Sequence, residues 1–382
     1  MRIGIEVQRI FRKKKHGMEV VALELIRQLQ QLDKVNEYIL FARNDEDRDC
    51  VAVTPNFDVR TIRSFGYASW EQVKLPKALK RYGIDFLHAT CNTAPIASSV
   101  PLILTLHDII YLENLNFRGS AYQNFGNIYR RFVVPKVVER SNMIITVSEF
   151  EKKVIMDRLN VSEDRMKVIP NAVSEKYLRI ASEAEKDSFR QQHQLPDAFL
   201  MFLGNKAPKK NTRNVILAYL AYCSATNDPL PLVVLDYQKV LLEALLYRLD
   251  KHSMIRHFIF PGYIHSDDMP LMYQCATAFL YPSLRESFGL PILESMAGGT
   301  PVITSSTSSM PEVAGDAAVL VDPFNTKSIA EGIGSLVSDM ELMAKLRQKG
   351  FERVKLYSWE RSARALMDVY DQTGNQILKS KS

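Results

Sequence analysis

The chain has 382 residues, of which 46% are hydrophobic and 24% charged, and this composition excludes a largely disordered or low-complexity protein. Its length favours two domains, each able to bury a core of its own. The formal net charge of +6 indicates an anionic partner, and charge alone leaves nucleic acid, a lipid surface and a phosphorylated substrate open.

The beginning of the chain and its cysteines indicate a cytoplasmic protein without a metal centre. Residues 1–17 lack the apolar run and the small-residue cleavage site of a signal peptide, and no window has the roughly 18 apolar residues of a spanning helix. The four cysteines lie far apart without a Cys-x-x-Cys pair, which argues against a zinc site or a disulfide framework. The basic residues 12–15 are typical of a solvated loop, with contact to a membrane or an acceptor as the alternative.

The first half of the chain alternates short β-rich runs with helical patterns. A helix is expected after Gly17, because apolar residues recur on one face from residue 18 to residue 32. The alternation predicts a parallel sheet covered on both faces. The β-rich runs are residues 3–7, 38–42, 85–89, 101–106 and 143–147.

The pattern starts again after a boundary near Asn171. The polar residues 179–197 are typical of a linker followed by a surface helix. Two doubly wound domains that face one another form a deep cleft, and their ligands bind beyond the carboxyl ends of the strands. The β-rich runs of the second half are residues 199–204, 231–235, 257–260, 277–281, 301–304 and 317–321.

Residues 283–302 read SLRESFGLPILESMAGGTPV and place two glutamates around a turn. Pro291 suits the first turn of a helix, so the amides of residues 288–290 (Phe288, Gly289 and Leu290) are expected at a helix N-terminus that favours a phosphate. Glu286 is expected in the loop before the helix and Glu294 in its first turn. Alone, each would be an ordinary loop or helix-start acid, whereas their combination with the Gly and Pro favours a binding site.

A second candidate site follows the strand that ends at Gly204. The loop GNKAPKKN carries Lys206, Lys209 and Lys210 just before a helix expected at Asn211 or Thr212. Cations at that position can neutralise a diphosphate, although the loop is not a Walker A sequence. Lys206 is expected to be solvated, and the other two lysines are the better candidates.

Two histidines and one glycine complete the candidates in the first half. His107 ends the run LILTLHD, where a ring can position a substrate hydroxyl, so we favour a functional role for it. His88 ends the run DFLHA, and functional and structural roles stay equally open. Gly17 either admits a phosphate or sugar to the N-terminus of the first helix or is a simple turn residue.

These motifs together resemble the retaining glycosyltransferases of family 4, among them mannosyltransferases of bacterial polysaccharide and lipopolysaccharide synthesis. The resemblance covers nearly the whole chain, and its most specific mark is the pair Glu286 and Glu294 with seven residues between them. Supporting marks are GNKAPKKN (204–211), TLHD (105–108), TVSEFEKK (146–153) and VIPNAV (168–173).

The resemblance implies a GT-B fold of two Rossmann-like domains, an acceptor-side domain over 1–172 with a crossover helix at 357–375, and a nucleotide-sugar domain over 173–356. It also implies that Glu286 contacts the donor sugar, that Glu294 holds the ribose, that Lys209 and Lys210 meet the diphosphate, and that the backbone near Tyr263 and Ile264 meets the base. No cofactor or metal is required by this arrangement.

The resemblance favours GDP-mannose as the donor and a glycan or lipid-linked acceptor, with peripheral contact to the inner membrane. A UDP-hexose donor and a sugar-nucleotide epimerase of the same fold are the alternatives. The lysines lie in strand-end loops rather than along one stripe, which argues against nucleic acid as the partner.

Overall fold

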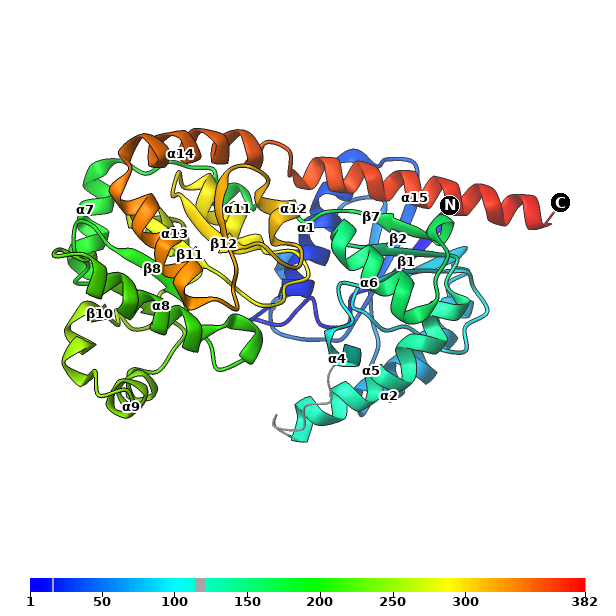
Figure 1. Ribbon diagram of the computed structural model, residues 1–382. Coiled ribbons are helices and arrows are strands. Elements are labelled where there is room, and N and C mark those ends of the chain that lie inside the picture. The colour runs from blue at the N-terminus through cyan, green and yellow to red at the C-terminus, as the bar shows by residue number, and fades with distance from the viewer. Residues whose placement is uncertain (16, 114–120, 382) are drawn as a thin grey trace. The chain divides into compact units, whose positions relative to one another are not determined.

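The structure is a computed structural model that describes residues 1–15, 17–113 and 121–381 (Figure 1). By its contacts the chain divides into two compact units. The first unit comprises Met1–Asn171 and Trp359–Ser382, and the second comprises Ala172–Ser358. Within the described ranges, no helix has the length and the apolar character needed to cross a bilayer.

The first unit is built on a parallel sheet with the strand order β3-β2-β1-β4-β5-β6-β7. This is the doubly wound order, in which the chain switches direction between β1 and β4. The strands are β1 (Arg2–Glu6), β2 (Glu37–Ala42), β3 (Phe57–Thr61), β4 (Phe86–Ala89), β5 (Leu102–Thr105), β6 (Met143–Thr146) and β7 (Met166–Val168).

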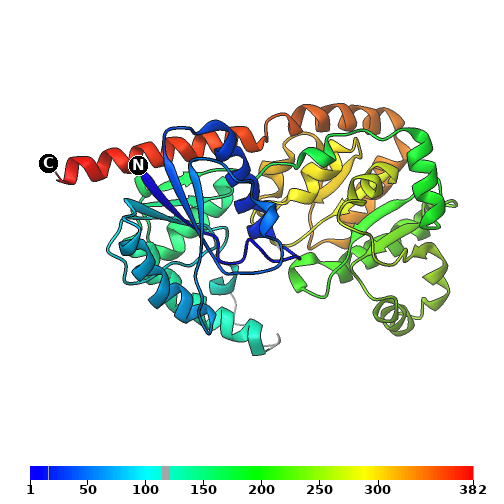
Figure 2. The ribbon, with the colours of Figure 1, turned by 180° about the vertical axis from the view of Figure 1, so that it is seen from behind.

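Helices cover both faces of this sheet. On one face, α1 (Gly17–Leu32) and α15 (Trp359–Lys381) bury Leu29, Leu366 and Tyr370 against the strands. Figures 1 and 2 show α15 along the same unit from both sides. The hydrophobic core on the other face of the sheet is covered by α3 (Leu75–Arg81), α5 (Ala121–Arg140) and α6 (Glu149–Leu159). The unit also has two short helices, α2 (Tyr67–Ser69) and α4 (Ile110–Glu113).

The second unit repeats the same architecture with the strand order β10-β9-β8-β11-β12-β13, all parallel, so its switch point lies between β8 and β11. The strands are β8 (Leu200–Leu203), β9 (Leu232–Leu235), β10 (Phe258–Ile259), β11 (Ala278–Tyr281), β12 (Val302–Ser305) and β13 (Ala318–Val321). The helices are α7 (Glu183–Gln192), α8 (Thr212–Ala225), α9 (Lys239–Arg248), α10 (Met269–Cys275), α11 (Leu290–Ala297), α12 (Met310–Ala314), α13 (Thr326–Ser338) and α14 (Met340–Val354).

The structure confirms the predicted α/β class with two parallel sheets and adds two strands that the sequence pattern missed. β3 and β7 are edge strands: β3 has one buried residue among five, and β7 has three residues in all. Edge strands need fewer apolar residues, so they carry little of the β-rich signal on which the prediction relied. The last helix also extends beyond the expected residue 375, to Lys381.

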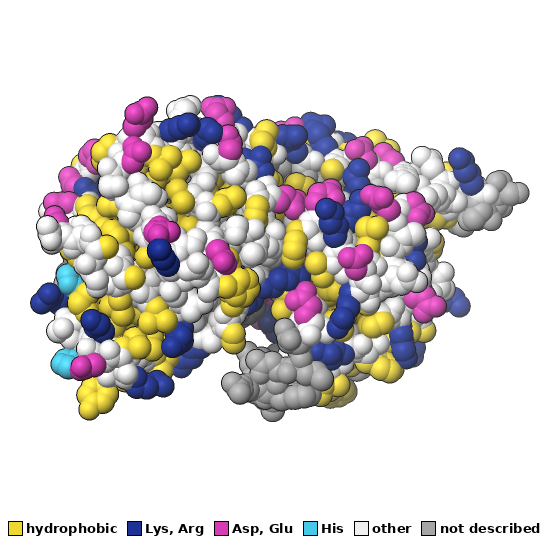
Figure 3. All heavy atoms as spheres, in the orientation of Figure 1, with side chains coloured by type: hydrophobic (Ala, Val, Ile, Leu, Met, Phe, Trp, Pro, Cys, Tyr) yellow, Lys and Arg dark blue, Asp and Glu magenta, His cyan; other side chains and the backbone are white. Residues whose placement is uncertain are grey.

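Charges of both signs are mixed on the face shown in Figure 3. Lys355, directly after α14, pairs with Glu352, and Arg364 of α15 pairs with Glu360. Each pair places charges of opposite sign side by side.

Candidate functional site

The candidate site lies at the switch point of the second unit, where the loops after β8 and β11 meet. The amide of Leu284 donates to the carbonyl of Lys209 at 2.7 Å and joins the two loops. Asn211, in the left-handed region with φ +60°, donates its side-chain amide to the carbonyls of Pro282 at 2.9 Å and Pro323 at 2.7 Å. These bonds fix the basic loop beside the loop that carries Glu286.

The loops bring two lysines and one glutamate together. Lys210 Nζ lies 2.7 Å from Glu286 Oε1 and 3.0 Å from the hydroxyl of Tyr281, and Lys209 Nζ lies 3.8 Å from Glu286 Oε2. Glu286 is 8% exposed, so it is not the exposed loop acid of the simpler interpretation. Two cations against one carboxylate leave an excess positive charge that suits an anionic group.

The backbone of Glu286 is held by two serines. The amide of Glu286 donates to Ser308 Oγ at 3.1 Å, and the hydroxyls of Ser308 and Ser309 reach its carbonyl at 2.7 and 2.9 Å. Ser309 Oγ also lies 2.8 Å from the carbonyl of Phe288. The sequence analysis missed both serines, because they come from the loop after β12 and only the folded sheet brings that loop next to β11.

Gly289 makes the turn into α11. It has φ +106°, a conformation that other residues rarely adopt, and a Cβ there would meet the side chain of Ile292 at 3.2 Å. α11 then begins at Leu290, with Pro291 in its first turn as expected. Phe288 is buried, and the centroid of its ring lies 5.7 Å from that of the Tyr357 ring. The first amides of a helix have no partner within the helix, so this end of α11 can accept an anion.

The expectation that Glu294 lies in the first turn of this helix is wrong. The first turn of α11 contains no acid, and Glu294 is the fifth helical residue, because the chain becomes helical only after the left-handed Gly289. Its Oε2 accepts a hydrogen bond from the hydroxyl of Tyr273 on α10 at 3.1 Å. Burial raises the pKa of Glu294 to about 7, although the hydroxyls of Tyr273 and Tyr177 and the charge of Lys176 act to lower it.

Three further predicted residues lie near strand ends of the same unit. Gly204 directly follows β8 and packs tightly, since a Cβ there would come within 2.7 Å of Tyr237 Cβ. Tyr263 and Ile264 follow β10; the tyrosine is 75% exposed and the isoleucine is buried. Among the described residues, the hydrogen bonds and ion pairs of Lys210 and Glu286 go to other side chains than those of Tyr263 and Ile264.

In the first unit, His107 is buried just beyond β5. Its amide donates to Asn92 Oδ1 at 2.7 Å, and its Nε2 lies 2.9 Å from the carbonyl of Thr90. A carbonyl only accepts, so Nε2 carries the proton and Nδ1 is the acceptor. Burial lowers the pKa of His107, which keeps the ring neutral and able to accept a hydrogen bond from a hydroxyl.

The other candidates of the first unit differ in how they are engaged. Both ring nitrogens of His88 are bonded, to Tyr370 and Thr105 hydroxyls at 2.7 Å each, and burial lowers its pKa to about 3, which favours the structural role. Gly17 is the first residue of α1 and has open space where a Cβ would lie. Among the basic residues 12–15 near the start of the chain, Lys15 pairs with Asp47.

Comparisons with known proteins agree with this geometry. Residues 183–353 match the family model described as Glycosyl transferases group 1, and residues 16–177 match the one described as Glycosyltransferase Family 4. The two matched segments correspond to the second unit and to most of the first.

Two curated relatives are bacterial mannosyltransferases. The O-antigen chain mannosyltransferase B of Escherichia coli is 32% identical over 273 residues, which cover 70% of this chain and 69% of that protein. The serotype-specific mannosyltransferase WbdA of Escherichia coli is 27% identical over 365 residues, or 91% of this chain. The chain spans less than half of WbdA, 44% of its length.

The fold is shared with solved glycosyltransferase structures. The sucrose-phosphate synthase of Thermosynechococcus elongatus superposes with a TM-score of 0.72 at 18% identity and covers 98% of this chain and 99% of that one. At this identity the likeness shows the fold alone, which is the GT-B class with two Rossmann-like domains.

Proposed function

The chain belongs to glycosyltransferase family 4, and from this premise we propose that it transfers a mannosyl residue from GDP-mannose to a glycan or lipid-linked acceptor with retention of the anomeric configuration. The mannosyltransferase names of two relatives support the choice of sugar. We place the reaction in the cytoplasm at the membrane face and assign it to the synthesis of a cell-surface polysaccharide.

The observation that carries this proposal is the cluster of Lys209, Lys210 and Glu286 at the switch point of the second unit. When the sugar of a nucleotide sugar is transferred, a nucleoside diphosphate is released. The reaction is fast only if the negative charge that develops on this diphosphate is neutralised. The two lysines and the N-terminal amides of α11 can supply that neutralisation. For this reason we propose a transfer that needs no divalent metal.

The remaining site residues have separate tasks in this proposal. Glu286, held beside Lys210, faces the donor sugar and stabilises positive charge that develops at its anomeric carbon. Glu294 accepts hydrogen bonds from the ribose hydroxyls, and the backbone near Tyr263 and Ile264 contacts the base. His107 accepts a bond from a sugar hydroxyl.

In the proposal the donor approaches the backbone at Gly204, directly after β8, and a phosphate or sugar approaches Gly17, the first residue of α1.

A donor panel tests the proposal directly. GDP-mannose, UDP-glucose, UDP-galactose and free GDP would each be added to the protein with EDTA present, and thermal stabilisation and slow donor hydrolysis recorded. We expect GDP-mannose to raise the melting temperature most and to release mannose. A response to UDP-hexoses alone would favour the alternative donor, an isomerised nucleotide sugar would favour the epimerase, and loss of activity in EDTA would contradict the metal-free mechanism.

A further inference from the structure

The loop after β12 contains a serine in a conformation that serine rarely adopts. Ser308 has φ +60°, in the left-handed region, where the Cβ of an L residue crowds the following carbonyl. Among the described non-glycine residues, positive φ occurs at Gln194, at Ser308 and otherwise only at Asn and Asp, which adopt this region most readily. Residues strained in this way cluster at functional sites, so the conformation of Ser308 calls for a compensating contact.

The compensating contact is with the main chain of Glu286. Ser308 Oγ accepts a hydrogen bond from the Glu286 amide at 3.1 Å and donates one to the Glu286 carbonyl at 2.7 Å. The same carbonyl lies 2.9 Å from Ser309 Oγ and 3.0 Å from Nη1 of Arg285. A single hydroxyl therefore holds both main-chain groups of Glu286, and the carbonyl has three donors for its two lone pairs.

The side chain of Glu286 explains why its main chain needs this restraint. Its two carboxylate oxygens lie 2.7 Å from Lys210 Nζ and 3.8 Å from Lys209 Nζ. In the proposed reaction both lysines also contact the diphosphate of the donor, so the diphosphate competes with Glu286 for them. A carboxylate on a mobile loop would move with the two cations, whereas a fixed carboxylate stays where positive charge develops on the sugar.

We propose that Ser308 is a positioning residue for the transfer step: its hydroxyl fixes the Glu286 peptide and so keeps the carboxylate in place while the lysines turn to the diphosphate. The inference rests on the proposed function, in which Glu286 acts on the donor sugar. A preorganised charge contributes most in the transition state and little to binding of the ground state. Loss of the Ser308 hydroxyl should therefore lower kcat and spare the affinity for the donor.

Two substitutions separate this role from a structural one. Ser308→Gly removes the hydroxyl and suits the left-handed backbone, whereas Ser308→Ala removes the hydroxyl and keeps the strain, so the alanine variant should melt at the lower temperature. We expect both variants to transfer mannose at least about tenfold more slowly per folded molecule, with a dissociation constant for GDP-mannose within about twofold of the wild type. A merely structural role would instead make the transfer rate follow the melting temperature.

Gln194→Gly is the matched control for the introduced glycine. Gln194 is exposed, belongs to the same unit and has φ +52°. It follows α7 in the chain, whereas Ser308 follows β12. The glycine should keep or raise the melting temperature here as well, and it should leave the transfer rate and the donor affinity unchanged.

A measurement without donor tests the contact itself. Hydrogen exchange, followed by mass spectrometry on peptides that contain Glu286, should show faster exchange of its amide in Ser308→Gly than in the wild type or Gln194→Gly. Unchanged exchange would overturn the restraint. Wild-type transfer rates in both Ser308 variants, or a loss of donor affinity as large as the loss of rate, would overturn the positioning role. The exchange measurement contains no nucleotide sugar, so a failed donor panel and a failed restraint would be recorded separately.

Discussion

In the proposed function Glu294 binds the donor, so the titration of its carboxyl should appear in the affinity for the donor. Its pKa is raised to about 7 by burial, so in the free protein it loses its proton only around neutral pH. A ribose hydroxyl donates to the ionised carboxylate, and the protonated acid accepts less well. We therefore predict that the dissociation constant of GDP-mannose rises as the pH falls below about 7, by at most about tenfold per pH unit because a single proton is involved.

Calorimetry between pH 6 and 8 checks this prediction, since the diphosphate of GDP-mannose is esterified at both ends and does not titrate there. Glu294→Gln should bind more weakly at pH 8 and show no such slope. If the wild-type protein had the same affinity at pH 6 and pH 8, the contact between Glu294 and the ribose would be refuted.

Lys210 and Lys206 lie in one loop and form a natural pair for mutagenesis. Lys210 contacts Glu286 and Tyr281, whereas Lys206 is exposed. Lys210→Ala should lower turnover about 10²-fold or more, because it removes a charge aimed at the leaving diphosphate. Lys206→Ala should leave turnover unchanged, and equal rates in the two variants, measured as mannose transferred per folded molecule, would contradict the assignment.

The sequence predicted these residues better than it predicted their partners. The spacing of Glu286, Gly289, Pro291 and Glu294 indicated a strand-end site, because each residue type has a local reason to stand there. The hydrogen bond from Tyr273 to Glu294 and those from Ser308 and Ser309 to the Glu286 backbone join separate elements. Contacts of that kind depend on the packing of α10 and the β12 loop, which no local pattern encodes.

At the scale of elements, α15 is joined to the first sheet by a buried polar contact. The hydroxyl of Tyr370 lies 2.7 Å from His88 Nδ1, and both side chains are almost fully buried. Tyr370→Phe removes this partner and leaves a buried ring nitrogen unpaired, so the first unit should lose about 1 to 3 kcal/mol of unfolding free energy.

Urea unfolding, monitored by tryptophan fluorescence, measures this loss of stability in the first unit. The chain has two tryptophans, Trp70 and Trp359, and both belong to the first unit. Tyr247→Phe is the control, since Tyr247 is 76% exposed. An unchanged midpoint for Tyr370→Phe would mean that α15 is held by its apolar residues alone.

The strands illustrate which elements a sequence pattern can predict. The central strands β1, β4 and β5 are apolar on both sides because helices cover both faces of the sheet, and they were predicted within a residue or two. The edge strand β3, with the sequence FDVRT, is mostly exposed and resembles a loop in composition. Only its pairing with β2 makes it a strand, and pairing is not local information.

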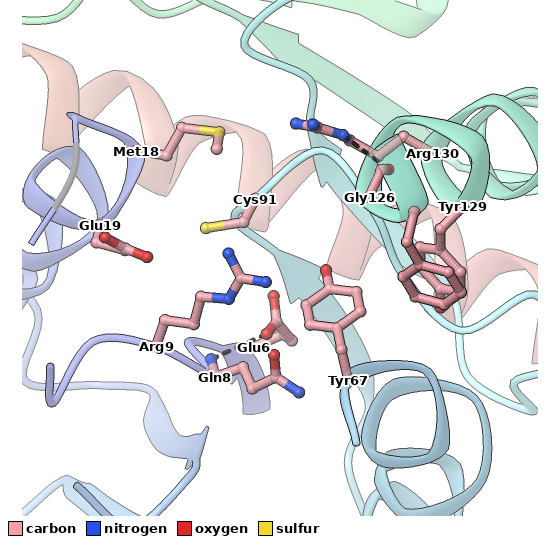
Figure 4. Close-up of a pocket in the computed structure, with 11 residues that line it drawn as sticks. Glu6, Gln8, Arg9, Met18, Glu19, Tyr67, Cys91, Gly126, Tyr129 and Arg130 are labelled. Carbon is pink, nitrogen blue, oxygen red and sulfur yellow. Dashed lines mark hydrogen bonds between the residues drawn. The ribbon is translucent and has the colours of Figure 1, made fainter. Parts of the chain in front are cut away.

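For the whole molecule, each unit is a doubly wound sheet with a switch point of its own. Lys210 and Glu286 follow β8 and β11 in the second unit, and a cavity lined by Glu6, Gln8 and Cys91 lies at the ends of β1 and β4 in the first (Figure 4). The two doubly wound sheets could be predicted from alternating strands and helices. The cavity of the first unit could not, because its residues come from separate segments whose side chains are unremarkable in sequence.

The central claim is that two glutamates of one loop and helix divide the work, with Glu286 in sugar transfer and Glu294 in nucleotide binding. The most direct test measures GDP-mannose affinity by calorimetry and mannose transfer for the wild type, Glu286→Gln and Glu294→Ala. We predict that Glu286→Gln binds GDP-mannose nearly as tightly as the wild type and transfers mannose about 10²-fold more slowly or worse, as expected for a contact that strengthens in the transition state. Glu294→Ala should lose about 1 to 3 kcal/mol of binding free energy. Transfer by Glu286→Gln at the wild-type rate would contradict the account.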